Sequence, residues 1–199
     1  MVQGINFHNC IEDIINKAKG QEPKEKYYSR EILDMIKIAF DMNVLYVPDT
    51  CIVEKRIDFN IMPGVSMTGK IDLVDVSGSK IVDHKTFNRK QYLLNEDGLK
   101  NDLQLNLYGY WYLNKLPKKK HLIYRHNQLN KVNFEGSLFT EAEVHRDDVF
   151  HYWGTKILPV VNEIWDMYQT CEKYKYTCNL ESCGDYGGCT YLKHCKNER

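Results

Sequence analysis

The segment Gly69–Thr86, GKIDLVDVSGSKIVDHKT, decides the fold. Its two runs of β-branched residues are divided by the turn-forming sequence Ser77–Gly78–Ser79, which predicts two strands joined by a tight turn. Residues 51–61 form a similar run, and a Met-Pro-Gly break separates them from the next one. The pattern therefore predicts three neighbouring strands of antiparallel tendency, over residues 51–61, 65–76 and 79–87.

Helical patterns flank these strands. Apolar residues recur at helical spacing over residues 5–15 and 29–40, and Ser29 is a typical N-cap for the second helix. The rest of the chain predicts a helix over 99–116, strands over 118–128 and 137–145, and a long helix over 145–174 with Pro159 as a candidate kink. We expect a single α/β domain over residues 1–199, in which helices flank a small central mixed β-sheet and a Cys-rich tail covers residues 171–199.

Length and composition exclude several classes of protein. The chain has 199 residues, with 27 Lys plus Arg against 27 Asp plus Glu. A zero net charge argues against a polycation that coats nucleic acid, although it leaves room for a local basic groove. The hydrophobic share of 43% excludes a disordered chain, and no apolar run approaches the roughly 18 residues of a membrane span. We expect a cytoplasmic protein without a secretory signal.

Two aspartates and a lysine lie on the predicted strands. Asp83 and Lys85 are two residues apart and share a face, whereas His84 points to the opposite face. Asp72 lies on the preceding strand, which the turn brings alongside. Carboxylates that leave positions open for water and phosphate suit Mg²⁺, and the ammonium of Lys85 could steady a hydroxide or a phosphate charge. The alternative is a set of solvent-facing aspartates with Lys85 as their ion-pair partner, although Asp is disfavoured inside strands.

Two pairs at helical spacing extend this group. Gln104 and Tyr108 are four residues apart on the helix after the strands, where they could hold a phosphate or the lysine. His8 and Glu12 form a second pair near the N-terminus, and the imidazole is a candidate metal ligand. Each pair taken alone also fits an ordinary half-buried helix surface.

Together, these residues resemble the PD-(D/E)XK nuclease superfamily, and within it the RecB-like exonuclease branch that includes phage and CRISPR-associated iron–sulfur enzymes. The family's early helix carries Gly-x-x-x-His with an acid one turn on, which matches Gly4, His8 and Glu12. Its first catalytic strand carries Gly-x-x-Asp, which matches the segment from Gly69 to Asp72.

The later motifs of the family follow in the same order. Its next strand carries an acid, any residue and then Lys, which matches Asp83 and Lys85. Its next helix carries Gln-x-x-x-Tyr, which matches Gln104 and Tyr108. The resemblance runs from Gly4 to Cys195 and implies a restriction-endonuclease-like fold.

The resemblance also implies metal-dependent hydrolysis of a phosphodiester bond. One or two Mg²⁺ or Mn²⁺ ions would be held by His8, Asp72, Asp83 and the main-chain carbonyl of His84. Lys85 would orient or activate the attacking water. Gln104 and Tyr108 would position Lys85 and the nucleic-acid backbone.

The expected function is that of a deoxyribonuclease, more specifically an exonuclease on DNA ends or single strands in recombination, repair or phage DNA processing. A helicase or recombinase is the expected kind of protein partner, in a bacterial or phage-infected cell. The rival reading is a non-catalytic DNA-binding or scaffold module of the same fold with a structural zinc site.

Five of the seven cysteines lie after residue 170. In an intracellular chain such clustering favours a metal site over disulfides, and four thiolates suit either Zn²⁺ or a [4Fe–4S] cluster. The resembling iron–sulfur nucleases combine three C-terminal cysteines with one upstream of the His-bearing helix, and this chain lacks the upstream one. Either Cys178 replaces it or the chain has lost a stable cluster; the candidate ligands are Cys178, Cys183, Cys189 and Cys195.

Residues 115–131 contain six Lys or Arg, among them Arg125, and no acid. This segment is a candidate track for a phosphate backbone. It equally fits a solvated loop followed by an edge strand that lysines protect from aggregation.

Overall fold

A computed structural model describes residues 2–22 and 27–170 of the chain. It divides into two units, residues 1–156 and residues 157–199, and each is considered by itself. Among the described residues, the first unit contains the sheet and the helices that pack on it, and α6 (Leu158–Thr170) lies in the second. Among the described residues, no helix combines the length and the apolar character needed to cross a membrane.

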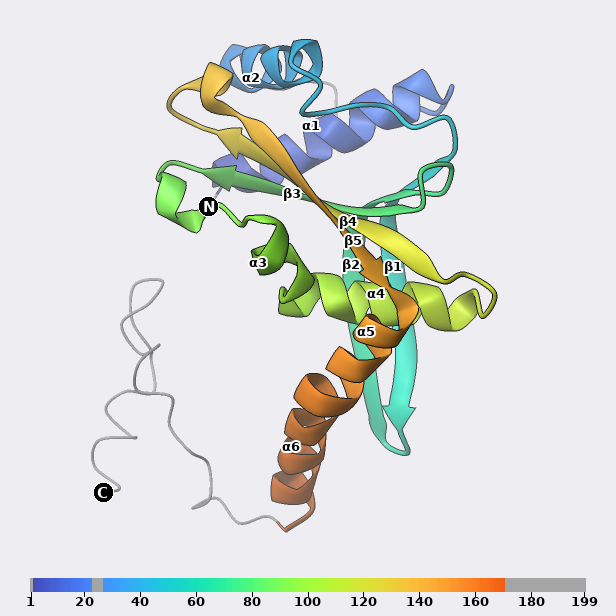
Figure 1. The fold of residues 1–199 in the computed structure, drawn as a ribbon. Coiled ribbons are helices and arrows are strands. Elements are labelled where there is room, and N and C mark those ends of the chain that lie inside the picture. The colour runs from blue at the N-terminus through green and yellow to red at the C-terminus, as the bar shows by residue number, and fades with distance from the viewer. Residues whose placement is uncertain (1, 23–26, 171–199) are drawn as a thin grey trace, which may run out of the picture. The chain divides into compact units, whose positions relative to one another are not determined.

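Five strands form one sheet in the order β1-β2-β3-β4-β5 (Figure 1). They are β1 (Cys51–Met62), β2 (Val65–Asp75), β3 (Lys80–Phe87), β4 (His121–Asn130) and β5 (Leu138–His145). The first three are antiparallel neighbours, as the sequence predicts. β4 runs parallel to β3 and antiparallel to β5, so the expectation of a mixed α/β sheet is confirmed.

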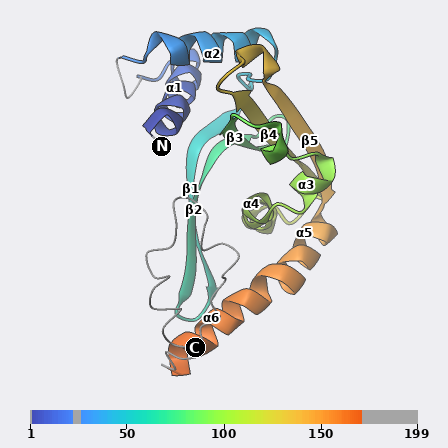
Figure 2. The ribbon, with the colours of Figure 1, turned by 90° about the vertical axis from the view of Figure 1, so that its left-hand side faces the viewer.

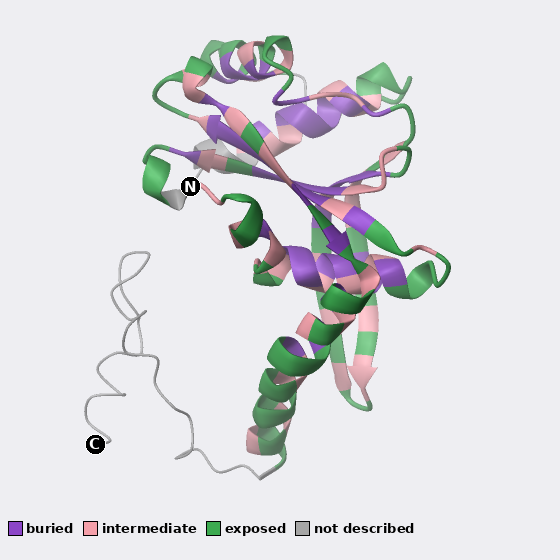
Figure 3. Ribbon diagram, in the orientation of Figure 1, coloured by how far each residue is buried: buried purple, intermediate pink, exposed green. Residues whose placement is uncertain are grey.

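Helices cover both faces of this sheet (Figure 2). α1 (Val2–Ala18) and α2 (Arg30–Asp41) bury apolar side chains such as Phe7 and Ile36 against Leu73 and Val82. On the other face, α4 (Leu103–Lys115) packs against residues that include Ile71 and Ile81. Figure 3 shows how burial concentrates on the strands and the facing sides of these helices. The sheet therefore lies between two apolar clusters that fix the position of β3.

Two helical predictions are wrong in their boundaries. The helix predicted over residues 99–116 is two helices, α3 (Glu96–Lys100) and α4, because Asp102 caps a new helix by accepting a hydrogen bond of 2.8 Å from the Leu105 N–H. The long helix predicted over 145–174 begins one residue later as α5 (Arg146–Tyr152), since His145 ends β5, and it passes through a π-helical turn (Trp153–Ile157) before α6. Pro159, which lacks an N–H, follows this irregular turn. Short 3₁₀ turns cover Lys90–Tyr92 and Phe134–Gly136.

Gly109 offers a test of the packing between α4 and the sheet. A Cβ at this position would lie 2.1 Å from the hydroxyl oxygen of Tyr124, which is fully buried in β4. We expect Gly109→Ala to lower the free energy of unfolding by about 1–2 kcal/mol, because overpacking outweighs the better helix propensity of alanine. Gly154→Ala, where nothing lies within 4 Å, is the matched control in urea denaturation and should not destabilise the chain. Equal stability of the two variants would show that the contact at Gly109 is loose.

Candidate active site

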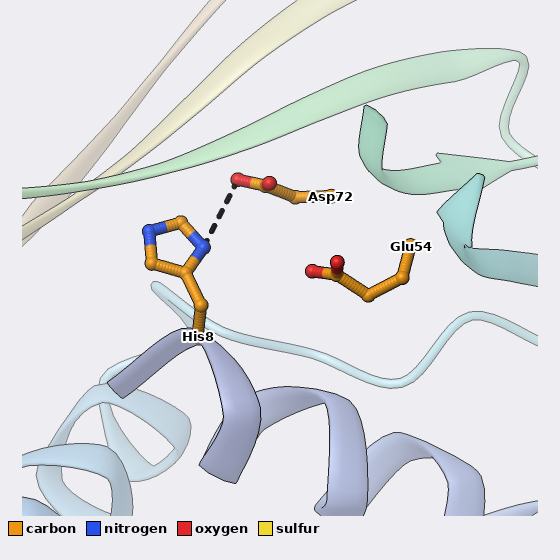
Figure 4. A group of neighbouring side chains, drawn as sticks. All are labelled: His8, Glu54 and Asp72. Carbon is orange, nitrogen blue, oxygen red and sulfur yellow. Dashed lines mark ion pairs between the residues drawn. The ribbon is translucent and has the colours of Figure 1, made fainter. Parts of the chain in front are cut away.

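Three side chains from three elements meet where α1 faces the first two strands (Figure 4). His8 comes from α1, Glu54 from β1 and Asp72 from β2, and one ligand atom of each lies within 4.8 Å of the others. His8 Nδ1 is 3.3 Å from Asp72 Oδ2, and the carboxylate of Glu54 points toward the space between them. One imidazole and two carboxylates form a donor set that a divalent cation can use.

Glu54 is the residue that the sequence did not reveal. It lies inside β1 with φ +50°, a left-handed conformation that is rare for glutamate and costs on the order of 1–3 kcal/mol. The ladder with β2 continues on either side of Glu54, where Val53 pairs with Leu73 and Lys55 pairs with Ile71. Glu54 also pairs with Lys70 in this structure, so a cation already balances its charge. Strained residues of this kind cluster at functional sites, which supports a role for the Glu54 carboxylate in this one.

Asp72 occupies the point where β2 and β3 separate. The ladder between these strands ends at the pair Leu73 and Val82. Beyond it, the main-chain N–H of His84 donates a hydrogen bond of 2.8 Å to Asp72 Oδ2 instead of to a strand carbonyl. Asp72 therefore ties the segment around His84 to His8 on α1.

A continuous chain of polar contacts runs from Asp83 across α4 and back to β2. Lys85 Nζ lies 2.9 Å from Asp83 Oδ2 and donates a hydrogen bond of 3.0 Å to Gln104 Oε1. Gln104 Nε2 donates to the hydroxyl of Tyr108, which itself donates to the main-chain carbonyl of Lys70, each at 2.8 Å. Gln104 thus holds the ammonium of Lys85 in place, and Tyr108 links Gln104 to β2.

Gly69 makes this arrangement possible. A Cβ at Gly69 would lie 3.2 Å from Tyr108 Cε1 and 3.3 Å from a side-chain carbon of Ile57, closer than such contacts normally come. The absence of a side chain lets the ring of Tyr108 reach the carbonyl of Lys70. The glycine three residues before Asp72 is therefore required for packing.

The charged groups of the site shift one another's pKa values. Burial alone would lower the pKa of His8, but the hydrogen bond and charge of Asp72 outweigh it and raise that pKa. Burial raises the pKa of Asp72, but the contacts with His8 and His84 together outweigh burial, so the net pKa of Asp72 is lowered. Burial lowers the pKa of Lys85, but the nearby carboxylates, Asp83 foremost, outweigh burial and raise the pKa, so the side chain stays an ammonium.

The pKa of Asp83 shifts upward, in contrast to that of Asp72. Burial, with the neighbouring charge of Asp72, raises the pKa of Asp83 from 3.8 to about 6, even though Lys85 opposes the shift. Asp83 is not among the three groups that lie within 4.8 Å of one another, but Asp72 is close enough to act on it. A cation placed beside both carboxylates would relieve their repulsion.

The raised pKa of Asp83 predicts a gain in stability on neutralising it. A carboxyl whose pKa is higher in the folded chain stabilises the fold when protonated, and that contribution is lost as pH rises from about 4 through about 6. In metal-free buffer at pH 8 we expect Asp83→Asn to raise the free energy of unfolding by about 1–3 kcal/mol. At pH 4, where Asp83 is protonated, the difference should vanish. Lower stability of Asp83→Asn at pH 8 would contradict the shift.

The structure also places the remaining sequence candidates. Glu12 is buried on α1, one turn beyond His8. Arg125, counted in the candidate phosphate track, is buried and bound to Glu141, so its inclusion there was wrong. Lys118 and Lys120 of the same segment are exposed. Cys178, Cys183, Cys189 and Cys195 lie outside the described residues.

A family model of the PD-(D/E)XK nuclease superfamily matches residues 6–196. Because the match covers almost the whole chain, the chain belongs to this superfamily. No curated protein and no solved structure matches it. Membership, with the mixed sheet, indicates a nuclease that hydrolyses phosphodiester bonds, and His8, Glu54 and Asp72 form a donor set that could hold a divalent cation.

Proposed function

We propose that the chain is a Mg²⁺- or Mn²⁺-dependent deoxyribonuclease that acts as an exonuclease on DNA ends or single strands. The observation that carries the proposal is the convergence of His8, Glu54 and Asp72 next to the ion pair of Asp83 and Lys85. A phosphodiester is hydrolysed only slowly without charge neutralisation and a polarised nucleophile, and this arrangement supplies groups for both.

The residues that would hold the ions are His8, Asp72, Asp83, the main-chain carbonyl of His84 and, in addition, Glu54. Hard oxygen donors with one imidazole fit Mg²⁺ or Mn²⁺. When bound, such an ion lowers the pKa of water and neutralises charge on the phosphate. Lys70, which pairs with Glu54 in the present arrangement, would have to release this carboxylate when an ion binds it.

Lys85 would act as an ammonium that orients the attacking water and stabilises charge on the phosphate oxygens. Its raised pKa favours this role over that of a base that removes a proton. Gln104 and Tyr108 are positioning residues, because their hydrogen bonds reach Lys85 and β2. Exposed Lys118 and Lys120 remain candidates for contact with the DNA backbone.

Digestion of matched DNA substrates tests the exonuclease assignment. The full chain is incubated with end-labelled linear duplex, linear single strands and a covalently closed circle of the same sequence, with Mg²⁺ or Mn²⁺. We expect label release from linear DNA and an intact circle. Cleavage of the circle would show endonuclease activity and contradict the exonuclease assignment. DNA binding without any metal-dependent product would favour the non-catalytic module.

We further propose that Cys178, Cys183, Cys189 and Cys195 hold a [4Fe–4S] cluster or Zn²⁺ that fastens the C-terminal tail. Four clustered thiols at these spacings support this assignment. Iron with visible absorption would identify the cluster, and zinc without colour would identify the structural metal. The absence of both metals from chain purified without oxygen would reject the site. A helicase or recombinase partner, in a bacterial or phage-infected cell, belongs to the same proposal.

A further inference from the structure

A run of buried polar residues in β4 lies beside the proposed metal-binding segment of β3. The run is Arg125–Gln128, and each of its side chains is buried. β4 is an inner strand of the sheet, between β3 and β5. Inner strands with a parallel neighbour are normally apolar, because buried polar groups are costly unless they are hydrogen-bonded. The parallel register places Asn127 directly beside His84.

The orientation of the Asn127 amide is fixed by Arg125. Arg125 Nε, which can only donate, gives a hydrogen bond of 2.6 Å to Asn127 Oδ1. Arg125 is itself held by Glu141 at 2.7 Å and by the main-chain carbonyls of Asn43 and Val44 at 3.2 Å and 3.0 Å. The oxygen of Asn127 is therefore on the Arg125 side, and its amino group is the part that faces His84.

This orientation determines the tautomer of His84. Asn127 Nδ2 lies 3.1 Å from His84 Nδ1 and is a donor, so Nδ1 must accept and carries no proton. The proton of the neutral ring is then on Nε2. His84 is 3% exposed, and Nε2 is buried without a hydrogen-bond partner among the described residues.

The unpartnered N–H belongs to a residue that already serves the site. The main-chain N–H of His84 binds Asp72, and its ring lies 6.2 Å from the ring of His8, centroid to centroid. Nε2 is on the edge of the ring away from the Nδ1 contact with Asn127. A buried donor left unpaired costs about 1–3 kcal/mol, and an ordered water with further polar partners removes that cost.

We propose that His84 is a positioning residue through its side chain, whose Nε2–H donates to a water ligand of the ion held by His8 and Asp72. Asn127, Arg125 and Glu141 keep the ring in the one tautomer that can donate there. Hydrogen bonds from outside the ligand set orient the ligands of a metal and tune its binding. This inference rests on the proposed function, because it requires the ion.

Nuclear magnetic resonance of the full chain with ¹⁵N-labelled histidine tests the inference. Protonated and unprotonated ring nitrogens resonate in separate ranges, and His84→Phe and His8→Phe assign the two sets of signals. Without metal we expect His84 to be neutral with its proton on Nε2. During a Mg²⁺ titration the His84 Nε2 signal should shift with the same half-saturation as His8. A proton on Nδ1 in the metal-free chain would overturn the inference.

The same titration separates failure of the inference from failure of the proposed function. If His8 responds to Mg²⁺ and His84 does not, the inference is wrong while the metal site stands. If neither responds at saturating Mg²⁺, the metal site itself is wrong, and the inference falls with it.

Variants of Asn127 give a second readout. We expect Asn127→Leu, which keeps the shape but removes the donor, to raise the Mg²⁺ half-saturation by about tenfold. Asn127→Asp keeps the contact with Arg125 and accepts from His84, so the proton should move to Nδ1 even if Asn127→Leu does not fold. Asn114→Leu, at an exposed position of α4, is the control. A purely structural Asn127 would lower the melting temperature without changing the tautomer or the half-saturation, which would overturn the inference.

Discussion

Lys85→Ala lowers the rate of Mg²⁺-dependent DNA cleavage by about a thousandfold, if Lys85 stabilises charge at the reacting phosphate. The expected effect is on turnover more than on metal binding, because the lysine is paired with Asp83 and Gln104 and is not itself a ligand. Single-turnover cleavage of labelled DNA at saturating Mg²⁺ and pH 8 measures it. At that pH Asp83 is ionised even in the metal-free chain.

The matched control is Lys37→Ala, which removes an exposed lysine of α2. It should leave the cleavage rate unchanged, which would show that losing one positive charge is not enough to slow cleavage. Gln104→Ala should have a smaller effect than Lys85→Ala, since Gln104 acts only through the position of the lysine. Cleavage by Lys85→Ala within tenfold of the wild-type rate would remove Lys85 from the reaction.

Arg125→Leu destabilises the fold by about 3–5 kcal/mol, because an apolar chain replaces a buried cation that donates four hydrogen bonds. The change leaves Asn127 and the carbonyls of Asn43 and Val44 without their donor, and it removes the stack on Phe139. Glu141 keeps a partner, since Lys80 also donates to it at 2.6 Å. Urea unfolding monitored by fluorescence measures the loss.

Arg56→Leu provides the control for this prediction, because Arg56 is exposed on β1. A surface substitution of this kind changes stability by no more than about 0.5 kcal/mol. If Arg125→Leu were equally mild, the buried network of β4 would not be a stabilising element, and its hold on Asn127 would be in doubt.

Much of the fold could be predicted from local pattern. The strands of residues 51–87 are alternating or β-branched runs with turn residues between them, so their antiparallel order follows from chain connectivity. The parallel pairing of β3 with β4 could not be read in this way, because the strands are separated by the α3–α4 crossover. The apolar pattern predicts one helix over residues 99–116 because it does not distinguish Asp102, which caps α4, from an interior residue.

The candidate site shows the same division. The spacing of Asp83 and Lys85, and of Gln104 and Tyr108, was readable because both pairs lie on single elements. Glu54 was missed because a left-handed residue inside a strand breaks the alternation on which the reading depends. The link from Asn127 to His84 depends on a pairing between distant segments, although the polar run of residues 125–128 was the visible sign.

The most direct test of the central claim is release of label from end-labelled linear DNA by the purified full chain, with wild type and Asp83→Ala assayed side by side. We expect release that requires Mg²⁺ or Mn²⁺, stops when the metal is chelated, and falls by at least about a thousandfold in Asp83→Ala. Equal release by Asp83→Ala, or no metal-dependent release by the wild type, would contradict the assignment of this site as a nuclease centre.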